Sequence, residues 1–255
     1  MQPQAPTRLI FLPGLGADHR LFKPQLAAFK NSACPKWIPH QREASLASYA
    51  ARFAATLPAS DPPVLVGFSF GGMVALELAR ILPVERRPLG VVLISGVRSA
   101  RAVSPAFKAQ QAIGSLIPHA IAHTLIAGPL TTVFAKRDRL DAQQATLLRE
   151  MASDIDTRFL FWAARACASW THDGRVPVPV AHIHWQHDSV IPYVPHPSLQ
   201  GGEAELVDAG HLISWTAADE VNAFIARSVA AFASRGPDPV DRADTAPYDD
   251  PVARD

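Results

Sequence analysis

Residues 64–82 constrain the fold of this chain more than any other segment. The apolar run Val64–Val66 is followed by Gly-Phe-Ser-Phe-Gly-Gly at 67–72, and apolar positions recur at helical spacing through Met73–Leu82. This order predicts a buried strand, a sharp turn that carries Ser69, and then a helix. Glycines are needed around such a turn because a Cβ atom there would collide with neighbouring backbone. The segment therefore predicts a serine exposed at the carboxyl end of a sheet, with a helix N-terminus behind it.

Strand and helix signals alternate along the rest of the chain. Strands are expected at Arg8–Leu12, Lys36–Pro39, Val64–Val66, Leu89–Ile94, Val178–Trp185 and Ala204–Val207. Helices are expected from Asp18 to about Lys30, from Ser45 to Leu57, over Met73–Leu82 and from about Ala217 to Ala233. Because several of the strands are apolar without alternation, the pattern predicts an α/β fold with about six parallel strands, doubly wound.

The stretch from Val97 to about Asp173 contains no convincing strand, and it is expected to form three to five helices. These helices are expected to form a cap that is inserted after the strand ending near Ile94. Core packing is expected for most of its large apolar residues, with some facing the site: Phe107, Leu116, Ile117, Phe134, Phe159, Trp162 and Trp170. The predicted boundaries are a core of residues 1–96 and 174–235, a cap of residues 97–173, and a disordered acidic, Pro-rich tail of residues 236–255.

Composition excludes several classes of protein. Only 18% of the 255 residues are charged, against ~25% in an average globular protein, and 48% are hydrophobic, which suffices for one sizeable core. The net charge of +1 leads us to expect no nucleic-acid partner, although two Arg and six Asp lie in residues 236–255 and leave +5 for residues 1–235. The two cysteines, Cys34 and Cys167, indicate reduced thiols. With no signal-peptide pattern and no apolar run near 18 residues, a cytoplasmic protein without membrane association is expected.

A serine hydroxyl becomes a good nucleophile only when a histidine takes its proton, and the histidine needs an acceptor that fixes its tautomer. Among ten histidines, position selects His211, which follows the last predicted strand in Asp-Ala-Gly-His at 208–211. Asp188 follows the preceding strand and is the predicted acid, with Asp208 as the alternative. The chain order of serine, acid and histidine is the one expected of such a triad on this architecture.

The developing oxyanion must also be held by backbone N–H groups. The residue directly after the nucleophile, Phe70, supplies one N–H group. Leu15, in the loop that follows the first predicted strand, is the best candidate for the second.

Taken together, the chain resembles the α/β-hydrolases, in particular their small, capped, esterase-like members. The motifs that carry the resemblance are Leu-Pro-Gly-Leu-Gly at 12–16, Gly-Phe-Ser-Phe-Gly-Gly at 67–72, Asp-Ser-Val-Ile-Pro at 188–192 and Asp-Ala-Gly-His at 208–211. The resemblance implies a Ser69–His211–Asp188 triad that hydrolyses its substrate through an acyl-enzyme. Two departures stand out. Pro13-Gly14 replaces the usual His-Gly, which leaves Leu15 or Gly16 as the second N–H donor, and Trp185 replaces a common glycine and is expected to narrow the pocket.

The predicted function is a serine hydrolase acting on a carboxylic ester or thioester of a small apolar substrate, with no cofactor and no metal. The same triad can also cleave carbon–carbon bonds or cyanohydrins, and the scaffold can serve as a non-catalytic ligand receptor. A serine at position 69 excludes the aspartate-nucleophile dehalogenases and epoxide hydrolases. A zinc site is a weaker alternative, since His182, His184 and His187 resemble a His-x-His-x-Asp-His motif with Gln186 in place of its aspartate.

Overall fold

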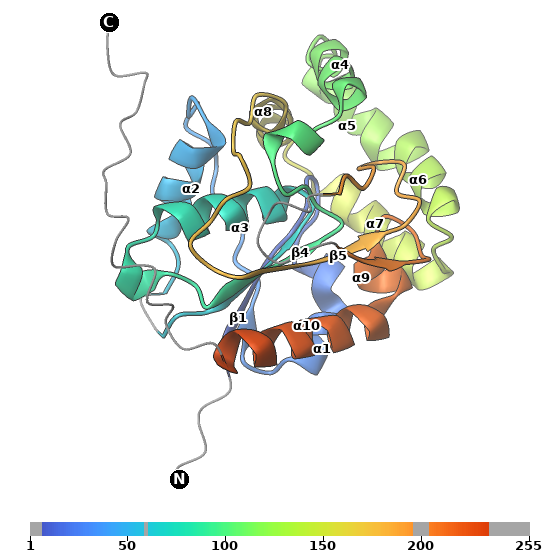
Figure 1. The fold of residues 1–255 in the computed structure, drawn as a ribbon. Helices are drawn as coiled ribbons and strands as arrows, with labels where there is room; N and C mark the ends of the chain where they lie inside the picture. The colour runs from blue at the N-terminus through green and yellow to red at the C-terminus, as the bar shows by residue number, and fades with distance from the viewer. Residues whose placement is uncertain (1–6, 59–60, 196–203, 235–255) are drawn as a thin grey trace, which may run out of the picture.

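The computed structural model of the protein describes residues 7–58, 61–195 and 204–234, and within them one sheet forms the centre of the molecule (Figure 1). Its strands are β1 (Leu9–Leu12), β2 (Ser32–Ala33), β3 (Val64–Phe68), β4 (Gly90–Ile94), β5 (Val180–Trp185) and β6 (Glu205–Val207). They run in the order β2-β1-β3-β4-β5-β6, and every neighbouring pair is parallel. The predicted sheet of about six parallel strands is confirmed.

Each face of the sheet is covered by helices, because successive side chains of a strand point to opposite faces and both sets are apolar. In β1, Ile10 and Leu12 belong to the hydrophobic cluster that includes α2 (Leu46–Ala54) and α3 (Phe70–Ile81). Leu9 and Phe11 belong to the cluster that includes α10 (Ala218–Ser234). Figure 1 shows α2 and α3 above the sheet and α1 (Lys23–Ala28) and α10 below it. This double burial explains why the strands read as continuous apolar runs.

The helices occur where capping residues and apolar spacing predict them. Ser45 caps α2 with a reciprocal hydrogen-bond pair to Ser48, and Asp18 accepts the backbone N–H of Arg20 at the start of the first helical turn. The core helices and helical turns are η1 (His19–Phe22), α1 (Lys23–Ala28), α2 (Leu46–Ala54), α3 (Phe70–Ile81), η2 (Val84–Arg86), α9 (Ile213–Thr216) and α10 (Ala218–Ser234).

The second strand lies outside the predicted range. The sequence predicts a strand at Lys36–Pro39, but the edge strand is β2 at Ser32–Ala33, paired with Leu9 and Ile10 of β1. The apolar character of Lys36–Pro39 comes instead from Trp37, whose ring lies 5.0 Å from that of Phe53 and 5.2 Å from that of Phe70. An apolar side chain that enters the core from a loop therefore produced a false strand signal.

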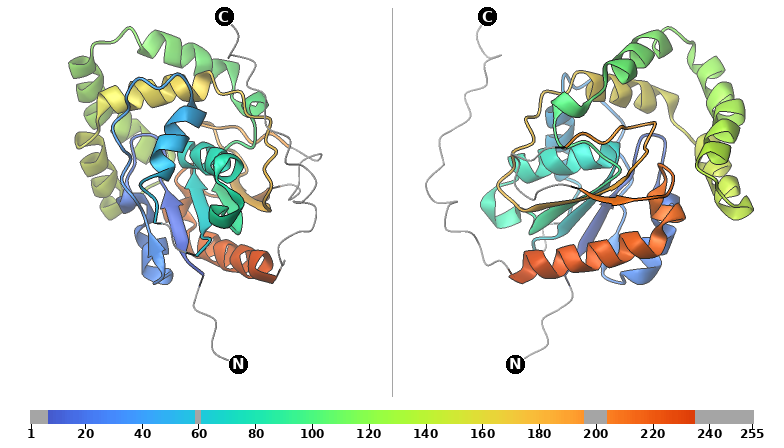
Figure 2. Two further views of the ribbon diagram at one scale, coloured as in Figure 1. Left: turned by 90° about the vertical axis from the view of Figure 1, so that its left-hand side faces the viewer. Right: turned by 45° about the vertical axis from the view of Figure 1, so that its right-hand side comes forward.

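Between β4 and β5 the chain forms only helices within the described residues. They are η3 (Ala100–Ala102), α4 (Pro105–Gly114), α5 (His119–Leu125), the π-helical turn η4 (Ile126–Leu130), α6 (Thr131–Arg137), α7 (Ala142–Ser153) and α8 (Thr157–Ala168). Figure 2 shows α4 to α8 as an arc that reaches beyond one side of the sheet. None of the described helices is both long and apolar enough to cross a membrane. The predicted tail of residues 236–255 lies outside the described residues.

Candidate active site

Ser69 occupies the turn between β3 and α3 in a conformation that non-glycine residues rarely adopt. Its φ is +51° and its ψ is −116°, and its backbone is held by hydrogen bonds from its N–H to Ile94 O (2.9 Å) and from Gly72 N–H to its carbonyl (2.9 Å). The neighbouring glycines leave room for this turn. A Cβ atom on Gly71 would lie 1.9 Å from the carbonyl oxygen of Leu12, and one on Gly67 would lie 2.5 Å from Gly72 N. The turn thus presents the Ser69 hydroxyl at the start of a helix.

His211 and Asp188 form a buried hydrogen-bonded pair, with Nδ1 of His211 2.6 Å from Oδ2 of Asp188. The other carboxylate oxygen of Asp188 accepts the backbone N–H groups of Val190 (2.8 Å) and Ile191 (2.9 Å). Burial by itself would raise the pKa of Asp188, but the bond to His211 and these backbone bonds outweigh it and lower the pKa below its usual range. Asp188 is therefore a carboxylate at neutral pH, whereas Asp208, the alternative acid, is exposed.

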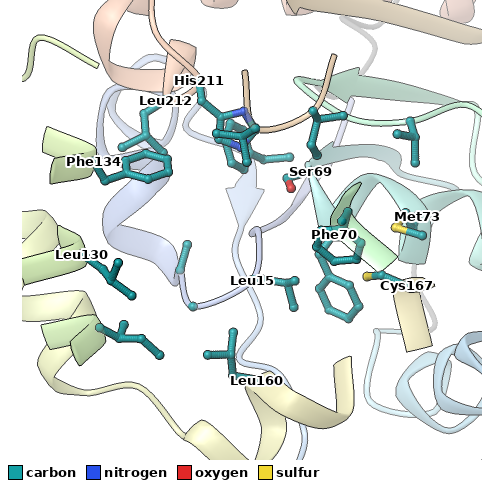
Figure 3. Close-up of a pocket in the computed structure, with 18 of the residues that line it drawn as sticks. Leu15, Ser69, Phe70, Met73, Leu130, Phe134, Leu160, Cys167, His211 and Leu212 are labelled. Atoms are coloured by element: carbon teal, nitrogen blue, oxygen red, sulfur yellow. The ribbon is translucent and has the colours of Figure 1, made fainter. Parts of the chain in front are cut away.

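One cavity of about 310 Å³ joins these residues. Ser69 and His211 both line it, as do Leu15, Gly16 and Phe70, so the structure brings all the predicted site residues except Asp188 to the cavity wall and Asp188 to the histidine behind it. In Figure 3 the Ser69 hydroxyl lies between the His211 ring on one side and Leu15 and Phe70 on the other. The arrangement leaves space for a substrate carbonyl next to Ser69.

The walls of the cavity are apolar. Among the described residues that line it there is no Asp, Glu, Lys or Arg, and His211 and Cys167 are the only titratable groups. Burial raises the pKa of the Cys167 thiol to about 12, so it lines the cavity as a neutral group. A cavity with these walls favours an uncharged substrate, because a charged group would lose its hydration without gaining a partner.

The inserted helices supply part of the cavity wall, and two of its residues, Ile126 and Leu130, were not predicted from the sequence. Residues Ile126, Leu130 and Phe134, spaced by four, face the cavity from η4 and α6, and the edge of the Phe134 ring meets the ring of His211 at 6.1 Å between centroids. Their helical spacing was visible in the sequence, but the direction in which the helix faces was not. Trp185 does not line the cavity and packs in the hydrophobic cluster that contains β1 residues Leu9 and Phe11. The prediction that Trp185 narrows the pocket is therefore wrong.

Two histidines of the zinc-like motif, His182 and His184, bond to one another, and His184 also bonds to the backbone. Nε2 of His182 lies 3.1 Å from Nδ1 of His184, and Nε2 of His184 lies 2.8 Å from the carbonyl oxygen of Ile191. Because that carbonyl can only accept, His184 carries its proton on Nε2 and presents Nδ1 as an acceptor. In the described part of the chain, no three His, Cys, Asp or Glu residues are grouped so that they could hold a metal ion.

Comparisons with solved structures show the same fold in other proteins. MenH from S. aureus superposes with a TM-score of 0.68 at 17% identity, covering 91% of this chain and 96% of that one. A thermophilic esterase from Thermogutta terrifontis gives 0.66 at 20% identity, covering 89% and 90%, and the enol-lactonase from Burkholderia xenovorans LB400 gives 0.65 at 18%, covering 92% and 94%. At these identities the likeness shows the fold alone. No curated protein matches the chain by sequence.

A family model settles the membership of the chain. The model of the alpha/beta hydrolase family matches residues 9–224, from the start of β1 into α10. The match spans all six strands, the Ser69 turn and the His211–Asp188 pair. This chain belongs to the alpha/beta hydrolase family.

Proposed function

We propose that the protein is a serine hydrolase that cleaves carboxylic esters or thioesters of small, uncharged, apolar substrates. The observation that carries this proposal is the position of Ser69 and His211 on the wall of one apolar cavity, with Asp188 bonded to the far side of the histidine. Membership of the alpha/beta hydrolase family supports hydrolysis as the class of reaction.

In the proposed mechanism, His211 removes the proton from Ser69 as the serine Oγ attacks the substrate carbonyl. Because Nδ1 of His211 donates to Asp188, its Nε2 carries the free lone pair that receives this proton. Asp188 stabilises the imidazolium that forms, and its own bonds from Val190 and Ile191 keep it in place. Protonated His211 then passes the proton to the leaving alcohol or thiol, which leaves an acyl group on Ser69.

The negative charge on the carbonyl oxygen must be stabilised as the tetrahedral intermediate forms. We assign this role to the backbone N–H groups of Phe70 and Leu15, with Gly16 as the alternative to Leu15. Phe70 is the first residue of α3, so the helix dipole favours the same charge. Water activated by His211 then attacks the acyl group and releases the acid.

We further propose that residues 97–173 act as a cap on a core of residues 1–96 and 174–235. The cavity has walls from both parts, which supports this division. In this role the cap sets which acyl and alcohol groups fit, while the core supplies the reacting groups.

The test is hydrolysis of p-nitrophenyl butyrate together with covalent labelling by a fluorophosphonate. Wild-type protein is expected to turn over the ester and to be labelled on Ser69, and Ser69→Ala is expected to remain folded and do neither. Ser104→Ala is the matched control, since Ser104 also lines the cavity. Labelling of Ser69→Ala at the wild-type rate would overturn the assignment, and a wild-type protein that binds ligands without labelling would indicate a receptor.

A further inference from the structure

A buried carboxylate from the inserted helices lies against the loop that carries His211. Asp138 ends α6 and is 2% exposed. Its Oδ2 accepts the backbone N–H of Leu212 at 2.7 Å, across 74 residues of chain, and its Oδ1 accepts from Nε of Arg137 at 3.2 Å. The mechanism above makes no use of this carboxylate, although Leu212 directly follows the proposed base.

The residue before His211 also meets Asp138. A Cβ atom on Gly210 would lie 2.8 Å from the carboxylate carbon and Oδ2 of Asp138 and 2.9 Å from its Cβ. Gly210 is not among the glycines with positive φ, so its backbone conformation is open to any residue and only this contact requires a glycine. Asp138 therefore touches the chain on both sides of His211.

The same end of α6 touches the histidine itself. Phe134, one turn before Asp138, meets the His211 ring edge-on, and the guanidinium of Arg137 lies 4.2 Å over the Phe134 ring while its Nε bonds to Asp138. Ring, guanidinium and carboxylate thus form one connected group on α6 that faces the His211 loop.

We propose that Asp138 is a positioning residue that holds His211 in line with Ser69 through the Leu212 N–H group. A carboxylate that accepts a buried backbone N–H group fixes the position of the loop relative to α6. The position of the loop in turn sets the direction in which Nε2 of His211 points. The proposal rests on the proposed function only in giving His211 the role of base. It makes the inserted helices part of the catalytic geometry, in addition to forming the pocket wall.

The test compares three variants by kcat and KM on p-nitrophenyl butyrate. Asp138→Ala is expected to lower kcat about 10- to 100-fold with KM changed less than threefold, while Asp138→Asn, whose amide oxygen still accepts from Leu212, recovers most of kcat. Asp141→Ala is the matched control, because it removes a carboxylate from the same segment that caps α7 and does not touch the loop. A kcat for Asp138→Ala equal to that of Asp141→Ala would overturn the proposal.

A double-mutant cycle tests the contact between Asp138 and Gly210. Gly210→Ala alone is expected to lower kcat about tenfold, and in an Asp138→Gly background, where no Cβ or carboxylate remains to clash, it should cost less than twofold. Equal costs in both backgrounds would count against the proposal.

One readout is independent of turnover. The proton in the short His211–Asp188 bond should give a low-field NMR signal in the wild-type protein, and Asp138→Ala should shift or broaden that signal. An unchanged signal contradicts the positioning role. A changed signal in a protein that hydrolyses no ester contradicts the proposed function and leaves the positioning role standing.

A separate observation concerns the outer surface of the inserted helices. Residues 97–137 contain five basic residues and no Asp or Glu. Arg98 is buried and Arg137 bonds to Asp138, whereas Arg101, Lys108 and Lys136 are exposed. Six of the ten large hydrophobic side chains that are exposed within the described residues lie in this segment: Ile113, Leu116, Ile121, Leu125, Leu130 and Val133. Leu116, which the sequence assigned to core packing, is 82% exposed. We call these six side chains the insertion face.

Four members of the insertion face form a stripe along one helical run. Ile121, Leu125, Leu130 and Val133 follow at steps of four, five and three residues, and the step of five falls in the π-helical turn η4, where each turn takes an extra residue. Leu130 is 55% exposed and also lines the cavity, so the stripe reaches the cavity wall. The outer surface and the proposed site are therefore continuous.

We infer that the insertion face docks on an anionic lipid surface. Exposed apolar side chains on a segment whose own exposed charged residues are all basic suit the boundary between lipid headgroups and acyl chains, and such contact needs no membrane-spanning helix. A second copy of the chain fits less well, because a symmetric contact would bring like charges together. Such docking would differ from the sequence-based expectation of no membrane association in surface contact alone.

The test is sedimentation of the full chain with vesicles of phosphatidylcholine, with or without phosphatidylglycerol. Binding is expected only with phosphatidylglycerol, weaker in high salt, and at least tenfold weaker for Leu116→Asp and Val133→Asp. Val84→Asp, an exposed hydrophobic residue of η2, is the matched control and should bind as wild type. Wild-type protein that stays in the supernatant, variants that bind equally, or a dimer that Leu116→Asp dissociates would each overturn the inference.

Discussion

Single residues decide whether the turn at Ser69 can form. At Gly71 a Cβ atom would overlap the carbonyl oxygen of Leu12. Both groups belong to backbone that is fixed by the fold, so neither can move away to relieve the clash. Gly114 of α4 carries no such constraint, since a Cβ atom there would meet nothing within 4 Å.

Gly71→Ala is accordingly expected to destabilise the protein by at least about 4 kcal/mol, in the range of severe packing faults, and to abolish ester hydrolysis. Gly114→Ala is the control and should be neutral or slightly stabilising, because alanine favours the helix. Urea unfolding followed by circular dichroism measures both. A Gly71→Ala protein with wild-type stability would contradict the packing argument.

At Asp188, charge and geometry can be separated by one substitution. Asp188→Asn keeps the shape but can present an amide N–H to His211, which favours the wrong tautomer of the ring, so kcat is expected to fall about 10³- to 10⁴-fold. Asp208→Asn changes an exposed carboxylate nearby and should keep wild-type kcat. Steady-state kinetics on p-nitrophenyl butyrate measures both variants, and a loss below tenfold for Asp188→Asn would move the acid role elsewhere.

At the scale of elements, the segment that leads from α8 into β5 is anchored by a buried histidine. The carbonyl of His172 accepts the Ala100 N–H and its Nδ1 accepts the Gly174 N–H, each at 2.8 Å, so the ring is neutral. Burial, with the nearby cation of Arg80, lowers the pKa of His172 to about 4.

This shift predicts a loss of stability in acid. Because the unfolded chain binds the proton near pH 6.5 and the folded chain only near pH 4, the contribution is complete above pH 6.5 and is lost as the pH falls toward 4, by up to about 3 kcal/mol. Urea unfolding at pH 7 and 4.5 measures it. His172→Gln, which cannot take up the proton, should show a shallower dependence, and equal slopes would contradict the prediction.

The alternating histidines of β5 form a sequence pattern that is compatible either with a metal site or with a hydrogen-bonded pair. His182 and His184 share a face of the strand, as paired metal ligands do, yet in this fold they bond to each other and to Ile191, which follows Asp188. The pair thereby supports the loop that carries the proposed acid. The alternation of the strand predicted the shared face, but not the partner.

At the scale of the whole molecule, the cavity lined by Ser69, His211 and the inserted helices is the proposed determinant of substrate choice. The cavity has a volume of about 310 Å³, and the described residues that line it include no Asp, Glu, Lys or Arg. It should therefore select neutral acyl groups of moderate length. We expect kcat/KM to rise from p-nitrophenyl acetate to the butyrate and hexanoate, since each buried CH₂ contributes about 0.8 kcal/mol.

The expected preference for neutral substrates can also be tested with an anionic ester. A p-nitrophenyl ester with a terminal carboxylate should be at least 100-fold poorer in kcat/KM than the neutral ester of equal length, because nothing in the described walls compensates for its lost hydration. Equal kcat/KM values would show that a cation outside the described walls reaches the substrate.

Much of this architecture follows from the sequence alone, because its causes are local. Strands that are buried on both faces appear in the sequence as uninterrupted apolar runs, and the capping residues Ser45 and Asp18 predict where helices begin. The glycines around Ser69 predict a turn that larger residues would not permit. The order of Ser69, Asp188 and His211 follows from the strand order. These features depend on residues close together in the chain or on the succession of elements.

Only the tertiary structure decided the features that depend on contacts between distant segments. It placed Trp37 in the core instead of a strand, exposed Leu116, turned Leu130 and Phe134 toward the cavity, and brought Asp138 against Leu212. Helical spacing shows which residues share a face, but a partner helix or loop far along the chain determines where that face points. The sequence therefore specified the proposed reacting groups, and the packing of the inserted helices specified their surroundings.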